Sequence, residues 1–256
     1  MRVSWLSVAP VKGLALVRRD AVTLEPFGVL ENRRFYVLDE QGKFVNGLTR
    51  VEHSLFGVVP VWDAEEDTLE LGFPDGKTVR GDVRLGERVS TWFYDRTVPG
   101  RLVEGPWSEE LSAYAGRELR LARSDAPGAA VDRSDGGVSI VSDESVDELG
   151  RQAGRPEPDA RRFRMLVGVS GGAPHEEDTW VGRDVRVGEA VVRVHEQVAR
   201  CAITTKHPDT GERDLDTLHV IKEYRGQRNG RHLDFGVYGS VVQAGRVRVG
   251  DAVGPL

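Results

Sequence analysis

The sequence contains one cysteine, Cys201, among its 256 residues. A single thiol cannot form an intrachain disulfide, a zinc site built from cysteines, or an iron–sulfur cluster held by four thiolates. If this protein uses iron–sulfur chemistry, the cluster must therefore belong to a partner. Taken without its neighbours, a lone cysteine is most often a small buried apolar residue.

Long apolar runs and an excess of positive charge are also missing. No apolar run approaches the ~20 residues that span a bilayer, and Lys12 interrupts any extension of the first ten residues into a secretory signal. The 35 Lys and Arg are outnumbered by 41 Asp and Glu, which gives a net charge of −6. This acidity disfavours non-specific nucleic-acid binding. We therefore expect a cytoplasmic protein that binds neither a membrane nor nucleic acid.

Glycine is frequent, with 30 residues spread along the chain. This distribution is typical of short strands separated by turns. In one segment Leu69, Leu71 and Phe73 alternate with other residues, as they would on one face of a strand. We predict strands near residues 3–6, 34–38, 55–62 and 68–73.

A short pattern with a central Gly-acidic pair occurs three times, at residues 82–89, 184–191 and 246–253. Each copy predicts a strand, a turn and a second strand. The offsets between the copies are uneven, which excludes a solenoid.

Helices are expected to be few, at residues 107–115, 142–153 and 214–225. Ser108 and Ser142 are predicted to be the N-caps of the first two, because a serine hydroxyl can accept a hydrogen bond from a free backbone N–H of the first turn. A small polar segment with Pro and Gly lies at residues 124–135. We place a domain boundary there and predict a mainly β protein with a few short helices, divided into residues 1–124 and 125–256.

The segment around Cys201 is the most informative one for chemistry. Arg200 directly precedes the thiol, and a fixed cation there would favour the thiolate that binds metals or attacks substrates. Strand alternation would instead point the two side chains to opposite faces. His195 and His207 each lie six residues from Cys201. This spacing matches neither a usual zinc site nor a cysteine-protease signature, so both readings are disfavoured.

Short motifs follow one another along nearly the whole chain. They include Pro-Val-Lys-Gly at residues 10–13, Arg-Cys at 200–201 and Phe-Gly-Val-Tyr at 235–238. Further matching segments lie at residues 28–35, 44–50, 162–164, 177–180, 204–205, 208–211, 224–225 and 249–251. In this order and spacing, the motifs resemble the MOSC family, named for the C-terminal domain of molybdenum-cofactor sulfurase. The resemblance implies a β-barrel-like MOSC N-terminal domain followed by a β-barrel MOSC domain.

The resemblance further implies a molybdenum-cofactor-dependent oxidoreductase, similar to the mitochondrial amidoxime-reducing component and its bacterial relatives. Such an enzyme would reduce the N–O bond of a small N-hydroxylated substrate. Cys201 matches the cysteine that ligates molybdenum in the family, so it would be both the metal ligand and the catalytic residue. The cofactor-binding positions that the resemblance implies are Lys12, Arg33, Asp135, Gly136, Arg164 and Tyr238.

One cysteine leaves no place for an iron–sulfur cluster in this chain. A separate electron-donor protein is therefore expected, such as a ferredoxin or a flavin reductase.

Three positions depart from the family pattern. Gly13 stands where the family often has Ser, Asn32 where Asp is usual, and Leu166 where many relatives have Asn. If each lost polar contact is worth ~1 kcal/mol, cofactor affinity would fall by roughly two orders of magnitude. Two alternatives therefore stay open: a sulfur or molybdenum-cofactor carrier that acts through Cys201, and a cofactor-free member of the family.

Overall fold

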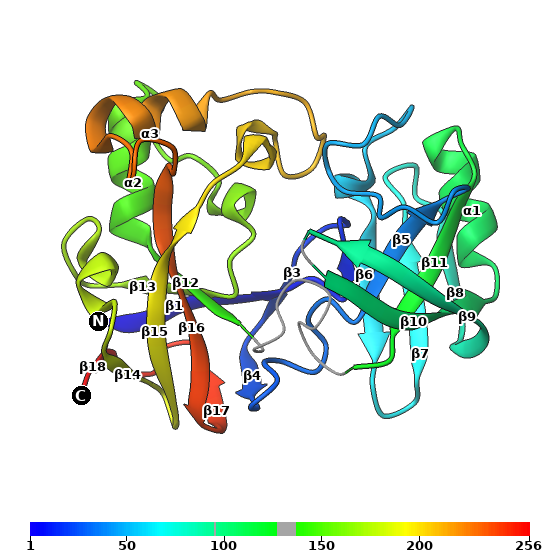
Figure 1. Cartoon of the computed structure of the whole chain (residues 1–256), viewed down its shortest axis with the longest axis horizontal. Helices are drawn as coiled ribbons and strands as arrows, with labels where there is room; N and C mark the ends of the chain where they lie inside the picture. Colours follow the sequence, from blue (N-terminus) through cyan, green and yellow to red (C-terminus); the bar gives the residue numbers. More distant parts are fainter. Residues whose placement is uncertain (95, 127–136) are drawn as a thin grey trace.

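The computed structural model describes residues 1–94, 96–126 and 137–256. Figure 1 shows two halves side by side, one formed mainly by the strands from β5 to β11 and the other by those from β12 to β18. The two chain ends lie together, because the N-terminal ammonium of Met1 donates to the Val253 carbonyl at 3.0 Å.

The larger sheet combines strands from both ends of the chain. Its spatial order is β18 (Val253–Pro255), β14 (Asp184–Val187), β15 (Ala190–Ala199), β16 (Asp234–Gln243), β12 (Val138–Ser142), β13 (Val167–Ser170), β1 (Arg2–Val8) and β3 (Val17–Arg19). The core against it consists mostly of valine with a buried Trp180. β-Branched side chains suit a pleated surface, which explains why these valine-rich segments form strands.

The second half contains two further sheets. One has the order β2 (Val11–Lys12), β5 (Phe35–Asp39), β11 (Leu119–Ser124), β10 (Arg96–Glu104) and β9 (Arg84–Phe93). The other consists of β6 (Val59–Asp63), β7 (Thr68–Gly72) and β8 (Thr78–Asp82). Valine and leucine make up most of the core of this half, together with a few aromatic residues, where Phe35 meets Trp62 edge to face with ring centroids 5.3 Å apart. A two-stranded sheet pairs β4 (Ala21–Leu24) with β17 (Gly245–Arg248).

The helices in the described part of the chain are short. They are α1 (Trp107–Ala115), α2 (Asp143–Gln152) and α3 (Thr217–Arg225), with the 3-10 turns η1 (Leu55–Gly57), η2 (Ala160–Phe163), η3 (Glu176–Trp180) and η4 (Ala202–Thr205). None of these helices has the length and apolarity needed to cross a bilayer. The predicted mainly β class with a few short helices is thus confirmed.

Several local predictions are confirmed and others are corrected. Ser142 caps α2, accepting from the Ser145 N–H at 3.1 Å. Ser108 does not cap α1: Pro106 occupies that position, and the Ser108 hydroxyl accepts from the Leu121 N–H on the neighbouring strand. The single strand predicted at residues 55–62 is instead η1 followed by β6, because the Ser54 hydroxyl accepts from Phe56 N–H and starts a tight turn.

The third helix is shorter than predicted. It begins at Thr217 and not at residue 214, because the side chain of Asp216 accepts from the His219 N–H and forms the cap. Asp214 lies before the helix and is held by Arg162.

The repeated pattern takes three different forms. Residues 184–191 form the predicted hairpin of β14 and β15. Residues 246–253 run from β17 to the first residue of β18, but these strands pair with β4 and β14 and not with each other. The turn predicted at Gly86 is wrong: this residue lies inside β9, and an irregularity in the pairing with β10 accommodates it.

Strands β1 and β3 lie in the sheet that otherwise comes from residues 138–255. The first 19 residues therefore contribute to both halves of the molecule. The domain division at residues 124 and 125 stays a prediction.

Candidate functional site

A cavity of about 730 Å³ brings together five of the seven predicted site residues. Its lining includes Lys12, Arg33, Arg164, Cys201 and Tyr238. The first two precede residue 124 in the chain and the other three follow it, so the wall draws on distant parts of the sequence. The remaining two predicted residues, Asp135 and Gly136, lie outside the residues that the structure describes.

Cys201 lies between the end of β15 and η4, and it is exposed. Its backbone is held in place, because its carbonyl accepts from the Thr204 N–H and from the Thr204 hydroxyl, each at 3.1 Å. The Thr204 hydroxyl also meets the Thr217 hydroxyl at 2.7 Å, which connects η4 to α3. A thiol on an otherwise fixed backbone is accessible to a metal or an electrophile from the cavity.

Arg200 lines the same cavity, but its guanidinium donates away from the thiol. It donates to the Phe235 carbonyl at 2.8 Å through Nε and to the Phe163 carbonyl at 3.1 Å. Burial lowers the pKa of Arg200 to about 10, although the nearby Tyr238 and Cys201 oppose this. Arg200 therefore stays charged at neutral pH and joins β15 to two other segments. Its effect on the Cys201 thiol stays a prediction.

Arg33 and Arg164 connect the two walls of the cavity. The Arg33 guanidinium donates to the Arg164 carbonyl at 2.9 Å, and the Arg164 guanidinium donates to the Leu14 carbonyl at 2.6 Å. Both arginines have left-handed backbones, with φ of 54° and 53°. This conformation costs about 1 kcal/mol or more for a residue with a side chain, so the surrounding structure must impose it.

Lys12 approaches the cavity from the end of β2. Its ammonium lies 5.3 Å from the centre of the Phe44 ring and 5.7 Å from that of Tyr94. Cations at such distances are attracted by the electron-rich ring face. The Arg164 guanidinium lies in a similar way, 5.3 Å from the Phe56 ring. Cationic and aromatic side chains therefore lie next to each other in the wall of the cavity.

The three departures from the family pattern have different positions. Gly13 lines the cavity, with φ of 93°. Asn32 is buried, and its side-chain oxygen accepts from the Ala9 N–H at 3.0 Å, so it supports the loop before Lys12. Leu166 is buried in the core of the larger sheet. The expectation that Leu166 removes a contact from the cavity is therefore wrong, because its side chain packs among apolar residues.

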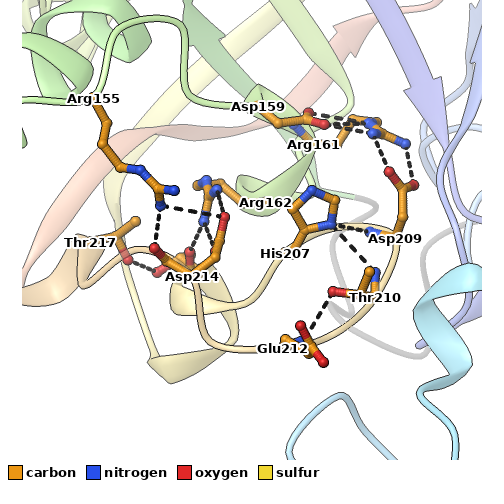
Figure 2. Close-up of polar contacts among 11 residues, drawn as sticks. Arg155, Asp159, Arg161, Arg162, His207, Asp209, Thr210, Glu212, Asp214 and Thr217 are labelled. Atoms are coloured by element: carbon orange, nitrogen blue, oxygen red, sulfur yellow. Dashed lines mark hydrogen bonds and ion pairs between the residues drawn. The ribbon is translucent and has the colours of Figure 1, made fainter.

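A network of ion pairs at the wall of the cavity, which Arg162 helps to line, was not predicted. Figure 2 shows Arg161 between Asp159 and Asp209, and Arg162 facing Asp214. The Arg162 side chain is 3 % exposed and also donates to the Thr204 carbonyl at 3.1 Å. Arg162 thus connects η2, which precedes Arg164, to η4, which follows Cys201.

The arginines in this network stabilise the ionised forms of the carboxyl groups that they face. Burial alone would raise the pKa of Asp214, but the Arg162 guanidinium outweighs burial and holds this pKa below its usual value. The pKa of Asp159 is lowered in the same way, because hydrogen bonds from Arg161 overcome the effect of burial. Whether such ion pairs form depends on which residues meet in the folded chain. The sequence therefore gives only a weak signal for this network.

The two histidines near Cys201 in sequence bond elsewhere. His195 Nε2 meets the Ser240 hydroxyl at 2.6 Å, and His207 Nδ1 accepts from the Asp209 N–H at 3.2 Å. Across the described ranges, no cluster of three or more His, Cys, Asp or Glu residues could hold a metal ion.

The fold and the cavity define a mainly β protein with one exposed thiol in a cationic, aromatic-lined cavity. Residues 127–254 match the MOSC domain, and residues 1–100 match the MOSC N-terminal beta barrel domain. The chain belongs to the MOSC family, as the motifs predicted.

The chain is also similar to individual proteins. The chain is 25% identical to mitochondrial amidoxime-reducing component 1 of Xenopus laevis, over 98% of this chain and 81% of that protein. It is 29% identical to the molybdenum cofactor sulfurase of Oryza sativa subsp. japonica, over 59% of this chain and 19% of that protein. Among solved structures, the YuaD protein of Bacillus subtilis aligns with a TM-score of 0.45 and 13% identity, over 98% of this chain and 93% of that one.

Proposed function

We propose that this chain is a molybdenum-cofactor-dependent oxidoreductase that reduces small N-hydroxylated substrates with electrons from a separate protein. The observation that carries the proposal is the exposed Cys201 thiol in a cavity that also contains Lys12, Arg33 and Arg164. The similarity to an amidoxime-reducing component over 98% of the chain supports the same reaction class.

The residues of the cavity fit the chemistry of this cofactor. A soft thiolate is a suitable ligand for molybdenum, and Cys201 would supply it. The pterin part carries a phosphate and polar ring edges, which suit ammonium and guanidinium donors. Lys12, Arg33 and Arg164 would hold these groups, with Tyr238 on the same wall. When bound, the cofactor supplies the redox chemistry that removes the oxygen of an N–O bond.

The protein groups then position and enclose the reacting atoms. Arg200 fixes the end of β15 through two carbonyls, so the Cys201 backbone keeps its place. The rings of Phe44, Phe56 and Tyr94 line the cavity and would exclude water from an apolar part of the substrate. Asp135 and Gly136 stay candidates for cofactor binding on sequence grounds, and a cytoplasmic location stays a prediction.

A carrier function is the second candidate. An exposed, singly occurring thiol is suited to carrying a persulfide sulfur, and the rice sulfurase relative matches 59% of the chain. A carrier would release sulfur on treatment with cyanide and would show no N-hydroxy reduction. The oxidoreductase is favoured because the cationic wall of the cavity fits a phosphate-bearing cofactor, which a persulfide carrier does not need.

The decisive experiment is metal analysis with pterin fluorescence, on protein from a host that makes molybdenum cofactor. We expect about one molybdenum per chain, from the single thiolate ligand, and its loss in Cys201→Ser. The matched control is Arg80→Ala, an exposed position on β8. A folded Cys201→Ser protein with full metal content and turnover would contradict the proposal. Cyanide-released sulfur without molybdenum would favour the carrier.

A further inference from the structure

Three arginines stand directly opposite one another on neighbouring strands. Arg88 on β9 pairs in register with Arg101 on β10, and Arg101 pairs in register with Arg123 on β11. Directly opposed residues share a face of the sheet, and like charges in these positions are destabilising. We call Arg88, Arg101 and Arg123 the arginine row. Asp67 offsets this repulsion at Arg123 and Asp125 offsets it at Arg101, so the repulsion is left mainly at Arg88, where an acidic partner would offset it.

The face that carries the row changes character along the hairpin of β9 and β10. At one end the register pair Leu85 and Val103 packs into the core of this half. At the other end Trp92 lies opposite Thr97 and is 63% exposed. Along this face, the packed pair of Leu85 and Val103 is therefore followed by the arginine row and then by the exposed Trp92. Arginine and tryptophan are enriched in protein interfaces.

Positive charge dominates locally although the whole chain is acidic. Arg123 donates to both carboxylate oxygens of Asp67, and Arg101 lies 3.8 Å from Asp125. Arg88 is exposed and makes no ion pair with any residue that the structure describes. A fourth arginine, Arg34, lies close by: burial lowers its pKa, and the charge of Arg123 lowers it further.

The hairpin also reaches the cavity of Cys201. Tyr94 and Arg96, at the turn that joins β9 to β10, belong to the cavity lining. Figure 1 shows these two strands extending from their own half toward the other half. A protein bound along this face would therefore lie beside the cavity that Cys201 also lines.

We propose that the arginine row and Trp92 form the docking surface for a small acidic electron-carrier protein, which binds with its redox group toward the cavity. The inference rests on the proposed function, because that function needs an external donor. Opposite charge would steer the carrier onto the row. The carrier's carboxylates would also relieve the repulsion between the arginines, while Trp92 supplies an apolar contact.

The test measures binding of two acidic probes, a plant-type [2Fe–2S] ferredoxin and a flavodoxin, to the holoenzyme by calorimetry at low and high salt. The variants are Arg88→Glu and Trp92→Ser. The matched control is Arg186→Glu, an exposed mid-strand arginine on β14. We expect Arg88→Glu to weaken binding at low salt by about tenfold or more, with the difference shrinking as salt screens the charges. Arg186→Glu should leave binding unchanged.

A chemical donor separates this inference from the proposed function. Turnover driven by reduced benzyl viologen needs no docking surface, so it should be the same in wild type and in Arg88→Glu. Absence of that turnover in the wild type would overturn the proposed function, whatever the binding results are.

Three results would overturn the docking surface. The first is that neither probe binds the wild type at low salt. The second is that Arg186→Glu weakens binding as much as Arg88→Glu does. The third is that a single-stranded oligothymidine binds the arginine row in preference to both proteins. Weaker binding in Trp92→Ser with unchanged viologen turnover would support it.

Discussion

Two groups of arginines in this molecule have opposite surroundings. At the wall of the cavity, Arg161 and Arg162 each face carboxylates (Figure 2), and the Arg162 side chain is almost fully buried. On β9, β10 and β11, Arg88 and Arg101 face another arginine across the sheet. The same residue type is therefore matched by carboxylates in one region and placed opposite like charge in the other. The difference teaches that charge content says little about stability until the partner of each charge is known.

The paired group contributes to the geometry of the site. Arg162 connects η2 to the carbonyl of Thr204, and Thr204 in turn binds the Cys201 carbonyl. Of the opposed group, Arg123 is also held by Asp67, whereas Arg88 makes no ion pair with a residue that the structure describes. Removing Arg162 should therefore have a large cost in stability, and removing Arg88 should have none.

The largest effect is expected from Arg162→Ala. It leaves the Asp214 carboxylate without its main partner, so the free energy of unfolding should fall by about 3 kcal/mol. Chemical denaturation measures this. The control Arg151→Ala removes an exposed pair with Glu148 and should cost less than about 0.5 kcal/mol. In the double variant Arg162→Ala with Asp214→Ala, the free energy of unfolding should partly recover, because the unpaired Asp214 carboxylate is also removed. Equal losses for Arg151 and Arg162 would contradict it.

Arg164→Ala should have the next largest effect, on cofactor retention. A charged hydrogen bond to the cofactor is lost, so the amount of pterin that copurifies should fall by about tenfold. The comparison is with Arg80→Ala on the exposed face of β8. The form and the amount of the released pterin can be measured by the fluorescence of the pterin after oxidation. Equal retention in the two variants would remove Arg164 from the site.

A third paired arginine predicts a pH effect. Arg225 donates to His175 Nδ1 at 2.9 Å and also pairs with Asp178. Burial, with a further contribution from Arg225, lowers the pKa of His175 from 6.5 to about 4. The unfolded chain therefore takes up a proton at His175 before the folded one does. Stability from this residue is complete above pH 6.5 and is lost as the pH falls toward 4.

His175→Asn isolates this contribution, because Asn tolerates the left-handed backbone that His175 adopts, with φ of 63°. The wild type should lose thermal stability between pH 6.5 and 4 more steeply than the variant does. Parallel melting curves across this range would exclude His175 as the cause.

The smallest effect is expected from Arg88→Ala. Its removal relieves the repulsion with Arg101, so the free energy of unfolding should stay the same or rise by an amount on the order of a few tenths of a kcal/mol. Scanning calorimetry at low salt gives the clearest reading. A clear fall in stability would show that Arg88 has a structural partner, and it would remove the contrast between the two groups of arginines.

Much of the architecture could be predicted because it depends on local patterns. Alternating apolar residues marked β7, and the Ser142 cap with acidic residues in the first turn marked α2. The failures arose where a tertiary partner outcompeted a local signal. Ser108 gives its hydroxyl to the N–H of Leu121, 13 residues away, and Gly86 continues a strand because β10 pairs along it.

The candidate site was predictable for a different reason. Its motifs are short, and their order along the chain pointed to Cys201, Lys12, Arg33, Arg164 and Tyr238, which the structure places around one cavity. Leu166 was misjudged, because the sequence does not tell which side of a segment faces the core. Its side chain is 2% exposed and belongs to the larger sheet's core.

The mainly β class, the family and the single thiol follow from the chain alone, because composition, periodicity and motif order are properties of the sequence. Which arginines meet a carboxylate and which oppose each other depends on the folded molecule. Arg33 meets Arg164 across 131 positions, and Arg162 meets Asp214 across 52. The energy of a charge depends on its burial and its neighbours, and strand register and chain packing bring these together only in the folded molecule.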